Sequence, residues 1–416
     1  MSTQLNLQTV EVAAKRLEDI LQPTPLQYSE RLSRKYGAQI YLKREDLMKV
    51  RSFKLRGAYN KISSLNETER KNGVVCASAG NHAQGVALSC AKLKIKGVIF
   101  MPLVTPNQKV EKVKYFGGKF IETVMIGDTF DEANEKAQAY CKKHKMTYVH
   151  PFNDYAVMAG QGTLAKEAYE ELKGKMDLII STVGGGGMLA GVATYIKEKN
   201  AKIKVVNAEP DSAPGLDESL KAGKVVTLKE MGTFVDGAAV RTMGDKTFAV
   251  LKDKIDISVI IPEGQICTSM IELYQSEGII TEPAGAVSVA SLEKLASKIK
   301  GKTVVCVISG GNNDILRYPE ILEKSLVYKG LKHYFVINFA QKPGQLKNFL
   351  NKALGPNDDI VRFEYIKKNN KETGPAFVGV ELKNANDYQP LLKRMEKYSI
   401  HYEVINSKDL LYGYLV

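Results

Sequence analysis

The sequence predicts an α/β fold with largely parallel sheets, followed by a smaller βαββαβ domain. Short apolar, β-branched runs alternate with longer amphipathic stretches through most of the chain, as in parallel sheets covered by helices. After about Lys324 the order changes to strand, helix, strand, strand, helix, strand, which is the ferredoxin-like arrangement. We therefore expect two domains, residues 1–325 and 326–416.

The strands of the first domain are expected at short apolar runs, namely residues 40–43, 74–77, 97–101, 178–182, 204–208 and 303–308. Amphipathic helices are expected between them, for example at residues 128–144 and 154–172. Glycine-rich turns follow several of these strands and open helices. In open α/β sheets, ligands bind at these carboxyl ends of the strands, so we expect the functional site there.

The second domain is expected to begin with a strand at residues 334–338, a Pro343-Gly344 turn and a helix at 345–352. Strands at 360–366 and 376–382, a helix at 387–397 and a strand at 401–405 complete it. At roughly 90 residues it is large enough to form its own core.

The composition is that of an ordinary globular protein, with 416 residues, 44% hydrophobic and 25% charged. We expect a cytoplasmic protein that does not bind a membrane, because no run of about 18 apolar residues occurs and the N-terminus is polar. The five cysteines form no CxxC pair, so neither a disulfide framework nor a metal site is expected. The net charge is +13, but lysines are scattered among acids, so we expect no nucleic-acid binding.

Three sequence segments together predict a pocket that binds a phosphorylated aldehyde. The first is Ser52-Phe53-Lys54-Leu55-Arg56-Gly57-Ala58, and the others are the glycine-containing turns at residues 78–85 and 183–188. A lysine amine can form a Schiff base with the aldehyde, and glycines can present bare N–H groups to a phosphate. This is the chemistry that pyridoxal phosphate requires. A single lysine or glycine run would mean little, but the three in this order are specific.

Individual side chains can be assigned within this pocket. Lys54 has apolar neighbours that would desolvate its amine and depress its pKa. The Asn81 amide could reach the phenolic oxygen of the ring, although an ordinary helix N-cap is the simpler interpretation. The backbone of Ser78, Ala79, Gly80 and His82 could form a nest for the substrate carboxylate.

Ser309 follows the strand expected at residues 303–308 and could hydrogen-bond the pyridine nitrogen, although such a serine is more often a turn former. A neutral hydroxyl does not hold that nitrogen protonated as a carboxylate would. The ring would then be a weaker electron sink, which favours expulsion of a β-substituent over a long-lived carbanion.

Taken together, these residues resemble the fold-type II (tryptophan synthase β-like) pyridoxal phosphate enzymes, and within them the threonine ammonia-lyases (threonine dehydratases). The resemblance covers roughly residues 5–320 and includes Thr24-Pro25-Leu26, Lys43-Arg44-Glu45-Asp46, the Lys54 segment, residues 78–85, His150-Pro151-Phe152-Asn153-Asp154, residues 184–187, Glu282-Pro283-Ala284-Gly285-Ala286 and Ser309-Gly310-Gly311-Asn312. The tail resembles one copy of the ACT-like regulatory domain of the biosynthetic form.

The resemblance implies that Lys54 carries pyridoxal phosphate and removes the Cα proton, that Asn81 and Ser309 contact the ring, and that the phosphate is bound by Gly184, Gly185, Gly186, Gly187 and Met188. It implies conversion of L-threonine to 2-oxobutanoate and ammonia, the first step of isoleucine biosynthesis, in a homotetramer. Isoleucine or valine would act as effector at the turn of residues 340–346.

Two positions depart from related serine racemases. Those enzymes have a serine where this chain has Ala79, so racemase activity is not expected. They also hold a divalent cation at positions matching Glu209, Ala213 and Gly215, but an aspartate stands in place of the glycine. The sequence therefore gives no support for a divalent-metal site, and a monovalent cation remains open.

Other interpretations stay open from the sequence. The chain could be a serine dehydratase, a cysteine synthase or another β-eliminating or β-replacing enzyme of the same type. It could also be a non-catalytic amino-acid sensor, although an intact Lys54 argues against this. The tail could serve only for docking or oligomerisation.

Overall fold

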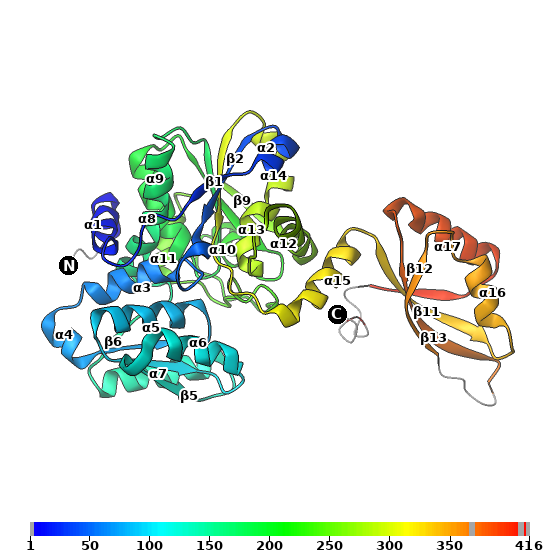
Figure 1. Ribbon diagram of the computed structural model, residues 1–416, viewed down its shortest axis with the longest axis horizontal. Helices are drawn as coiled ribbons and strands as arrows, with labels where there is room; N and C mark the ends of the chain where they lie inside the picture. The colour runs from blue at the N-terminus through cyan, green and yellow to red at the C-terminus, as the bar shows by residue number, and fades with distance from the viewer. Residues whose placement is uncertain (1–3, 366–370, 407–411, 413–416) are drawn as a thin grey trace. The chain divides into compact units, whose positions relative to one another are not determined.

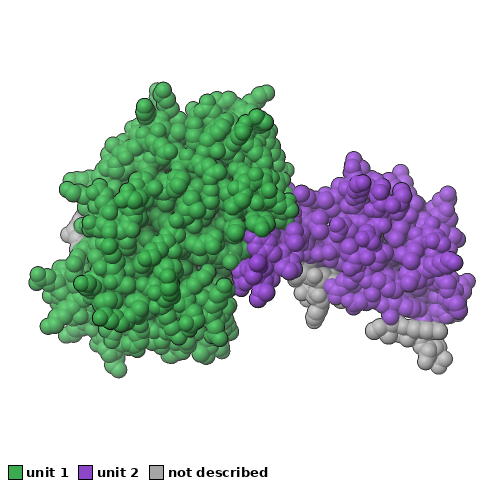
Figure 2. All heavy atoms as spheres, viewed as in Figure 1, with its two compact units in different colours: residues 1–313 green, residues 314–416 purple. Residues whose placement is uncertain are grey.

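The computed structural model describes residues 4–365, 371–406 and 412. The chain forms two compact units, Met1–Asn313 and Asp314–Val416, coloured separately in Figure 2. The boundary expected from the sequence, between residues 325 and 326, falls within helix α15 (Tyr318–Tyr328) of the second unit.

The larger sheet of the first unit has six strands in the order β1-β2-β10-β7-β8-β9. Only β1 runs antiparallel to its neighbour, and the remaining pairs are parallel. The strands are β1 (Leu26–Tyr28), β2 (Gln39–Arg44), β10 (Thr303–Ile308), β7 (Leu178–Thr182), β8 (Lys204–Pro210) and β9 (Ile257–Ile261). Every residue of the central strand β7 is buried, as expected for a parallel strand covered on both faces.

The smaller sheet of the first unit is wholly parallel and has the order β5-β4-β3-β6. Its strands are β5 (Ile121–Met125), β4 (Gly97–Met101), β3 (Val74–Ala77) and β6 (Thr147–Tyr148). In Figure 1 it lies with α5, α6 and α7, away from the larger sheet. The two sheets confirm the α/β class, and β3, β4, β7 and β10 have the bounds expected from the sequence.

The helices of the first unit follow from amphipathic stretches with recognisable ends. For example, Asp154 accepts hydrogen bonds from the N–H groups of Ala156 and Val157 and so caps α8. The helices are α1 (Leu7–Leu17), α2 (Glu30–Tyr36), α3 (Lys54–Ser63), α4 (Glu67–Asn72), α5 (Asn81–Leu93), α6 (Asn107–Gly117), α7 (Phe130–Lys143), α8 (Tyr155–Glu171), α9 (Gly187–Lys199), α10 (Gly215–Ala222), α11 (Asp245–Leu251), α12 (Glu263–Glu277), α13 (Pro283–Ala290) and α14 (Leu292–Ile299).

One hydrophobic core of the first unit lies between α8, α9 and the larger sheet. Leu164 and Val192 from the helices pack in one cluster with Ile179 and Val305 from β7 and β10. A second core fills the space between α5, α6 and the smaller sheet. Burial of these apolar faces holds the strand ends, and therefore the turns that follow them, in fixed positions.

The second unit confirms the predicted βαββαβ order. After α15 it contains β11 (Lys332–Ala340), α16 (Gln345–Lys352), β12 (Asp359–Tyr365), β13 (Thr373–Glu381), α17 (Tyr388–Lys397) and β14 (Tyr402–Ile405). Its antiparallel sheet has the order β12-β13-β11-β14. Phe335, Phe349, Val378 and Leu391 contribute to its core. The predicted strand end at residue 366 lies outside the described residues.

Short 3₁₀ turns complete the chain at Glu45–Leu47, Gly118–Phe120, Ile315–Arg317 and Ala385–Asp387. All five cysteines are buried, and none of them forms a disulfide. Within the described parts of the chain, no helix combines the length and the apolar character that crossing a bilayer would require.

Candidate active site

Lys54 is the first residue of α3 and lies beside the end of β10. The preceding loop is fixed to that strand end, because the Phe53 N–H donates to the Ser309 carbonyl at 3.1 Å and the Gly311 N–H donates to the Arg51 carbonyl at 2.9 Å. On the other side α5 packs closely, since a Cβ at Gly85 would lie 3.1 Å from the Lys54 carbonyl group. The backbone of Lys54 is therefore held from two directions.

The Lys54 amine is suited to act as a nucleophile and a base. Its Nζ donates to the Pro151 carbonyl oxygen at 3.0 Å. Burial lowers the pKa of Lys54 to about 8, and the Glu282 carboxyl opposes this shift only in part. Lys54 is thus much more readily neutral near physiological pH than a surface lysine, and the neutral amine is the reactive form.

The turn of four glycines follows β7 and begins α9. Gly186 has a φ of +86°, which favours glycine, and it is the residue before the helix. A Cβ at Gly185 would lie 2.3 Å from ring carbons of Phe152, and one at Gly187 would lie 2.8 Å from the Phe152 Cα. The first N–H groups of α9, including that of Met188, have no intrahelical acceptor and can bind an anion.

One short segment, Pro151-Phe152, therefore links Lys54 to the glycine turn. Pro151 accepts the hydrogen bond from the Lys54 amine, and the next residue, Phe152, packs against Gly185 and Gly187. The residue before Gly184 is buried, and Gly184 itself approaches Ala238 so closely that a Cβ would lie 3.0 Å from its Cα. Pro151 and Phe152 belong to the motif at residues 150–154, and their part in linking Lys54 to the glycine turn is visible only in the structure.

The turn at residues 78–80 follows β3 and precedes α5. The Ser78 Oγ accepts a hydrogen bond from the Gly80 N–H at 3.2 Å, and Ala79 is half-buried. A Cβ at Gly80 would meet no atom of the described residues within 4 Å, so space is open beside this backbone. The arrangement is compatible with the expected carboxylate nest.

The side chain of His82 does not face that open space. Its Nε2 lies 2.8 Å from the Val149 carbonyl oxygen, which fixes the proton on Nε2 because a carbonyl only accepts. Burial and the nearby Lys54 lower the pKa of His82 to about 3, so the ring is neutral. Of the expected roles for His82, the one that fits this position is a backbone N–H in the first turn of α5.

Ser309 directly follows β10 and has a buried hydroxyl group that makes, among the described residues, only one long hydrogen bond. Its Oγ donates to the Ala284 carbonyl at 3.3 Å, and the same carbonyl accepts a shorter bond of 2.8 Å from the Thr182 hydroxyl. Ala284 thus keeps a partner if the Ser309 hydroxyl turns to a ring nitrogen.

Asn81 is held by two residues to which the sequence assigned no role. Its Nδ2 donates to Glu282 and its Oδ1 accepts from Asn312, each at 2.7 Å. Burial, followed by the nearby Asp236, raises the pKa of Glu282 to about 7. The signal in the sequence was an acidic residue directly before Pro283 at a helix start, which indicates an N-cap as readily as a site.

The set of groups fits pyridoxal phosphate. It combines a depressed-pKa amine, a turn of glycines with free N–H groups, open space beside Gly80, a weakly engaged buried hydroxyl at Ser309 and an amide at Asn81. A residue with a Cβ could not replace Gly185 or Gly187 without displacing Phe152.

The Glu209 carboxylate, which matches a cation position of related racemases, is engaged by its own chain. It accepts the N–H groups of Leu216 and Asp217 at 2.7 and 2.9 Å, and the Asn207 Nδ2 at 2.8 Å. It therefore satisfies the start of α10. Across the described residues, no three acidic, histidine or cysteine side chains gather in a way that could hold a metal ion.

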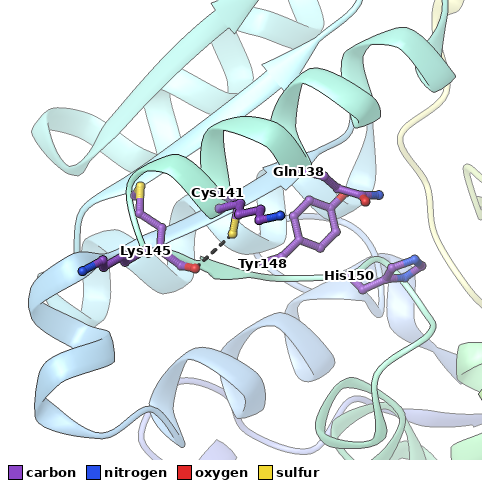
Figure 3. A pocket seen from close by; sticks show the side chains of 7 residues that line it. Gln138, Cys141, Lys145, Tyr148 and His150 are labelled. Carbon is purple, nitrogen blue, oxygen red and sulfur yellow. Dashed lines mark hydrogen bonds between the residues drawn. The ribbon is translucent and has the colours of Figure 1, made fainter.

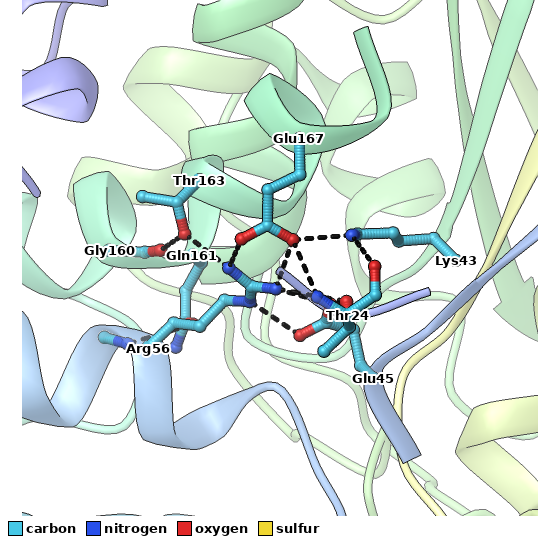
Figure 4. Close-up of polar contacts among 9 residues, drawn as sticks. Thr24, Lys43, Glu45, Arg56, Gly160, Gln161, Thr163 and Glu167 are labelled. Carbon is cyan, nitrogen blue, oxygen red and sulfur yellow. Dashed lines mark hydrogen bonds and ion pairs between the residues drawn. The ribbon is translucent and has the colours of Figure 1, made fainter. Parts of the chain in front are cut away.

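A buried ion cluster supports the helix that carries Lys54 (Figure 4). Arg56 of α3 bonds Glu45 at 2.7 and 2.9 Å and Glu167 of α8 at 2.5 and 2.8 Å. Lys43 of β2 bonds Glu167 at 2.5 Å, and the Thr24 hydroxyl donates to Glu45 at 2.6 Å. The cluster connects β2, α3 and α8, and Arg56 lies two residues after Lys54.

A separate pocket of about 470 Å³ lies where α7 meets β6 (Figure 3). It is lined by Gln138, Cys141, Lys142, Lys145, Met146, Tyr148 and His150. None of the residues expected in the site lines it, although His150 begins the segment that leads to Pro151. We do not assign the chemistry to this pocket.

The family profile described as "Pyridoxal-phosphate dependent enzyme" matches residues 17–310. The chain belongs to this family. A second profile, described as "C-terminal regulatory domain of Threonine dehydratase", matches residues 323–415 of this pyridoxal-phosphate dependent enzyme. The match confirms the resemblance inferred from the sequence motifs.

Relatives and solved structures agree with the family. The chain is 52% identical to L-threonine dehydratase biosynthetic IlvA of Bacillus subtilis over 404 residues, covering 97% of this chain and 96% of that protein. It is similar to the processed form of threonine deaminase isoform 2 from Solanum lycopersicum (38% identity, TM-score 0.73, 77% of this chain and 93% of that one). It is also similar to a serine racemase from Dictyostelium discoideum (32% identity, TM-score 0.70, 75% and 99%).

Proposed function

We propose that this enzyme is a threonine ammonia-lyase, which converts L-threonine to 2-oxobutanoate and ammonia by β-elimination of water. The observation that carries the proposal is the Lys54 amine, whose pKa is lowered to about 8 and which donates to the Pro151 carbonyl oxygen. The next residue, Phe152, packs against the glycine turn. The names of the biosynthetic threonine dehydratase relatives support threonine as the substrate.

The residues of the chain have distinct tasks in this reaction. Pyridoxal phosphate, when bound to Lys54, supplies an electron sink for the substrate Cα. The turn of residues 184–188 would hold the phosphate, Asn81 and Ser309 would contact the ring, and the backbone of residues 78–82 would hold the substrate carboxylate. The neutral Lys54 amine accepts the Cα proton, and the β-hydroxyl takes up one proton and leaves as water, so the proton removed from Cα is balanced. The released enamine then reacts with water to give 2-oxobutanoate and ammonia.

A substrate panel tests the proposal. Full-length protein with pyridoxal phosphate should form 2-oxobutanoate from L-threonine, and Lys54→Ala should not. The same panel with L-serine and O-acetylserine separates a serine dehydratase or a cysteine synthase from a threonine enzyme. A wild-type protein that shows no visible cofactor absorption would instead favour a non-catalytic amino-acid sensor.

We further propose that isoleucine, or valine, binds the second unit at the turn of residues 340–346. Gly344 there has a φ of +86° and precedes α16, whose first N–H groups can donate hydrogen bonds to a carboxylate. Gln341 belongs to the same turn, and its side-chain amide packs against Gly374 of β13. Both polar atoms of this amide are buried, and among the described residues neither has a hydrogen-bond partner. Threonine saturation curves with and without millimolar isoleucine or valine test this role against one of docking alone.

The boundary between catalysis and regulation is proposed at residues 325 and 326, and the assembly as a homotetramer in the cytoplasm. The enzyme would catalyse the first step of isoleucine biosynthesis. Light scattering of the purified full-length protein tests the assembly, because a tetramer should have four times the 46.0 kDa mass of the chain.

A further inference from the structure

Three polar side chains form a continuous hydrogen-bonded chain beside Lys54. The Asn312 Nδ2 donates to the Val50 carbonyl oxygen at 2.8 Å and to the Asn81 Oδ1 at 2.7 Å. The Asn81 Nδ2 donates to the Glu282 Oε1 at 2.7 Å. The chain joins the loop before α3, the turn after β10, the start of α5 and the start of α13.

The direction of these hydrogen bonds, that is, which group donates and which accepts, is fixed by the groups at the two ends of the series. The Val50 carbonyl can only accept, so Asn312 must direct its NH₂ group toward it. The same NH₂ group meets Asn81, which must then present its oxygen to Asn312 and its NH₂ to Glu282. Reversing the Asn81 amide would place two donors against each other at Asn312 and two oxygens against each other at Glu282.

We propose that Glu282 and Asn312 are positioning residues, which hold the Asn81 amide with its N–H group available to the cofactor. The Asn81 Nδ2 carries two hydrogens, and the bond to Glu282 uses one of them. The inference rests on the proposed function and deepens it, because Asn81 is the residue expected to contact the phenolic oxygen of the ring.

The position of Glu282 argues for this role over a purely local one. It is the residue before α13, where an acidic side chain commonly caps the helix, yet its carboxylate makes no capping bond. The carboxylate reaches Asn81 through a gap that exists only because residue 310 is glycine, since a Cβ there would lie 2.4 Å from the Glu282 Oε1. Its burial is costly, and Asn81 supplies one of the bonds that stabilise the charged form.

The charged groups around Glu282 come from several elements. Lys54 of α3 is close enough for its pKa to respond to this carboxyl, while Asp236 raises and Lys109 of α6 lowers the pKa of Glu282. Lys109 and Asp236 also pair with each other at 3.3 Å. The orientation of the Asn81 amide nevertheless depends on which neighbours donate and which accept. A substitution can exchange a donor for an acceptor at residue 312 or 282 and still leave a polar group there.

The test compares Asn312→Asp with the double variant Asn312→Asp/Glu282→Gln in the full-length protein. The single variant turns a donor into an acceptor, so the Asn81 amide should reverse and meet Glu282 with its oxygen. We expect lower thermal stability and at least about tenfold weaker binding of pyridoxal phosphate to the cofactor-free protein. In the double variant the amide introduced by Glu282→Gln can donate to the reversed Asn81, so stability should recover in part, because the Val50 carbonyl still lacks its donor at position 312. Cofactor affinity and the visible absorption of the bound cofactor should remain altered.

Recovery of stability, affinity and absorption together in the double variant would overturn the proposal, as would unchanged affinity in Asn312→Asp. Glu282→Gln and Glu282→Ala provide a second comparison should Asn312→Asp fold poorly. Glutamine keeps an acceptor for Asn81, so affinity should stay within about threefold, whereas alanine should weaken it about tenfold. Equal affinities of these two variants would also overturn the proposal.

Asn60→Asp is a matched control on the same helix as Lys54. Asn60 is buried, donates to the Ala156 carbonyl at 2.7 Å and accepts from Arg16 at 3.1 Å, so its substitution breaks a similar amide chain outside the site. It should lower stability and leave cofactor affinity unchanged.

The wild type separates failure of the proposed function from failure of the positioning role. If the wild type itself neither binds pyridoxal phosphate nor deaminates threonine, the proposed function fails. If the wild type does both and the variants bind the cofactor as it does, only the positioning role is refuted.

Discussion

Replacing Arg56 with methionine should destabilise the first unit by about 3–5 kcal/mol, the usual cost of removing one partner from a buried ion pair. The Arg56 and Lys43 side chains are 0% exposed, as is Glu45, and Glu167 is 15% exposed. The intact cluster balances two positive against two negative charges. Methionine fills much of the volume but leaves two carboxylates facing one lysine.

The pKa shifts of Arg56 and Glu167 both show that the buried ion pair stabilises the charged forms, which agrees with a loss of stability when Arg56 is removed. Burial would lower the pKa of the Arg56 guanidinium, but Glu45 and Glu167 outweigh it and raise the pKa. Burial likewise opposes ionisation of Glu167, yet Arg56 and Lys43 hold its pKa below the usual value. A carboxyl with a depressed folded-state pKa stabilises the fold above its unfolded pKa and loses that contribution as the pH falls through the folded-state pKa.

Urea unfolding at neutral pH, followed through the absorption of the bound cofactor and through circular dichroism, measures the effect on the first unit. The double variant Arg56→Met/Glu45→Met leaves the balanced Lys43–Glu167 pair, so it should lose less than the sum of the two single variants. Arg34→Met is the matched control, because Arg34 pairs with Glu30 at 2.5 Å on the surface and should cost less than about 1 kcal/mol. A loss below about 1 kcal/mol for Arg56→Met, or strict additivity in the double variant, would refute the reasoning.

Three further residues give sharp expectations. Lys54→Ala should abolish both deamination and covalent attachment of the cofactor, and substantial turnover would mean that another base acts. In the wild type, attachment of pyridoxal phosphate should accelerate as the pH rises through about 8, because the neutral amine attacks, and a flat rate between about pH 7 and pH 9 would contradict the lowered pKa of Lys54. Ser309→Asp should protonate the ring nitrogen and increase carbanion side reactions relative to elimination, whereas an unchanged rate and product ratio would show that Ser309 does not touch the ring. Gln341→Leu should remove the response to isoleucine without altering the threonine saturation curve measured in its absence, and a persisting response would place the effector elsewhere.

The interior strands of the first unit could be predicted because a strand that is buried on both faces is a continuous apolar run in the sequence. Strands β3, β4, β7 and β10 are short apolar runs, and their observed bounds are those expected. The strands that the sequence analysis did not name are the outer strands β1, β9, β5 and β6 of the two sheets. An edge strand is covered on fewer sides, so it needs fewer apolar residues, and β5 has no fully buried residue.

The sequence by itself determined the fold class, the βαββαβ tail and the residue types of the site, because periodicity and glycine placement are local properties of the chain. Only the tertiary structure decided how those residues act. The lowered pKa of Lys54 arises from its surroundings, and the polarity of the Asn81 amide is set by Val50, Asn312 and Glu282. The pKa shifts and the hydrogen-bond directions depend on groups that are distant in the sequence. They are therefore set only when folding brings these groups together.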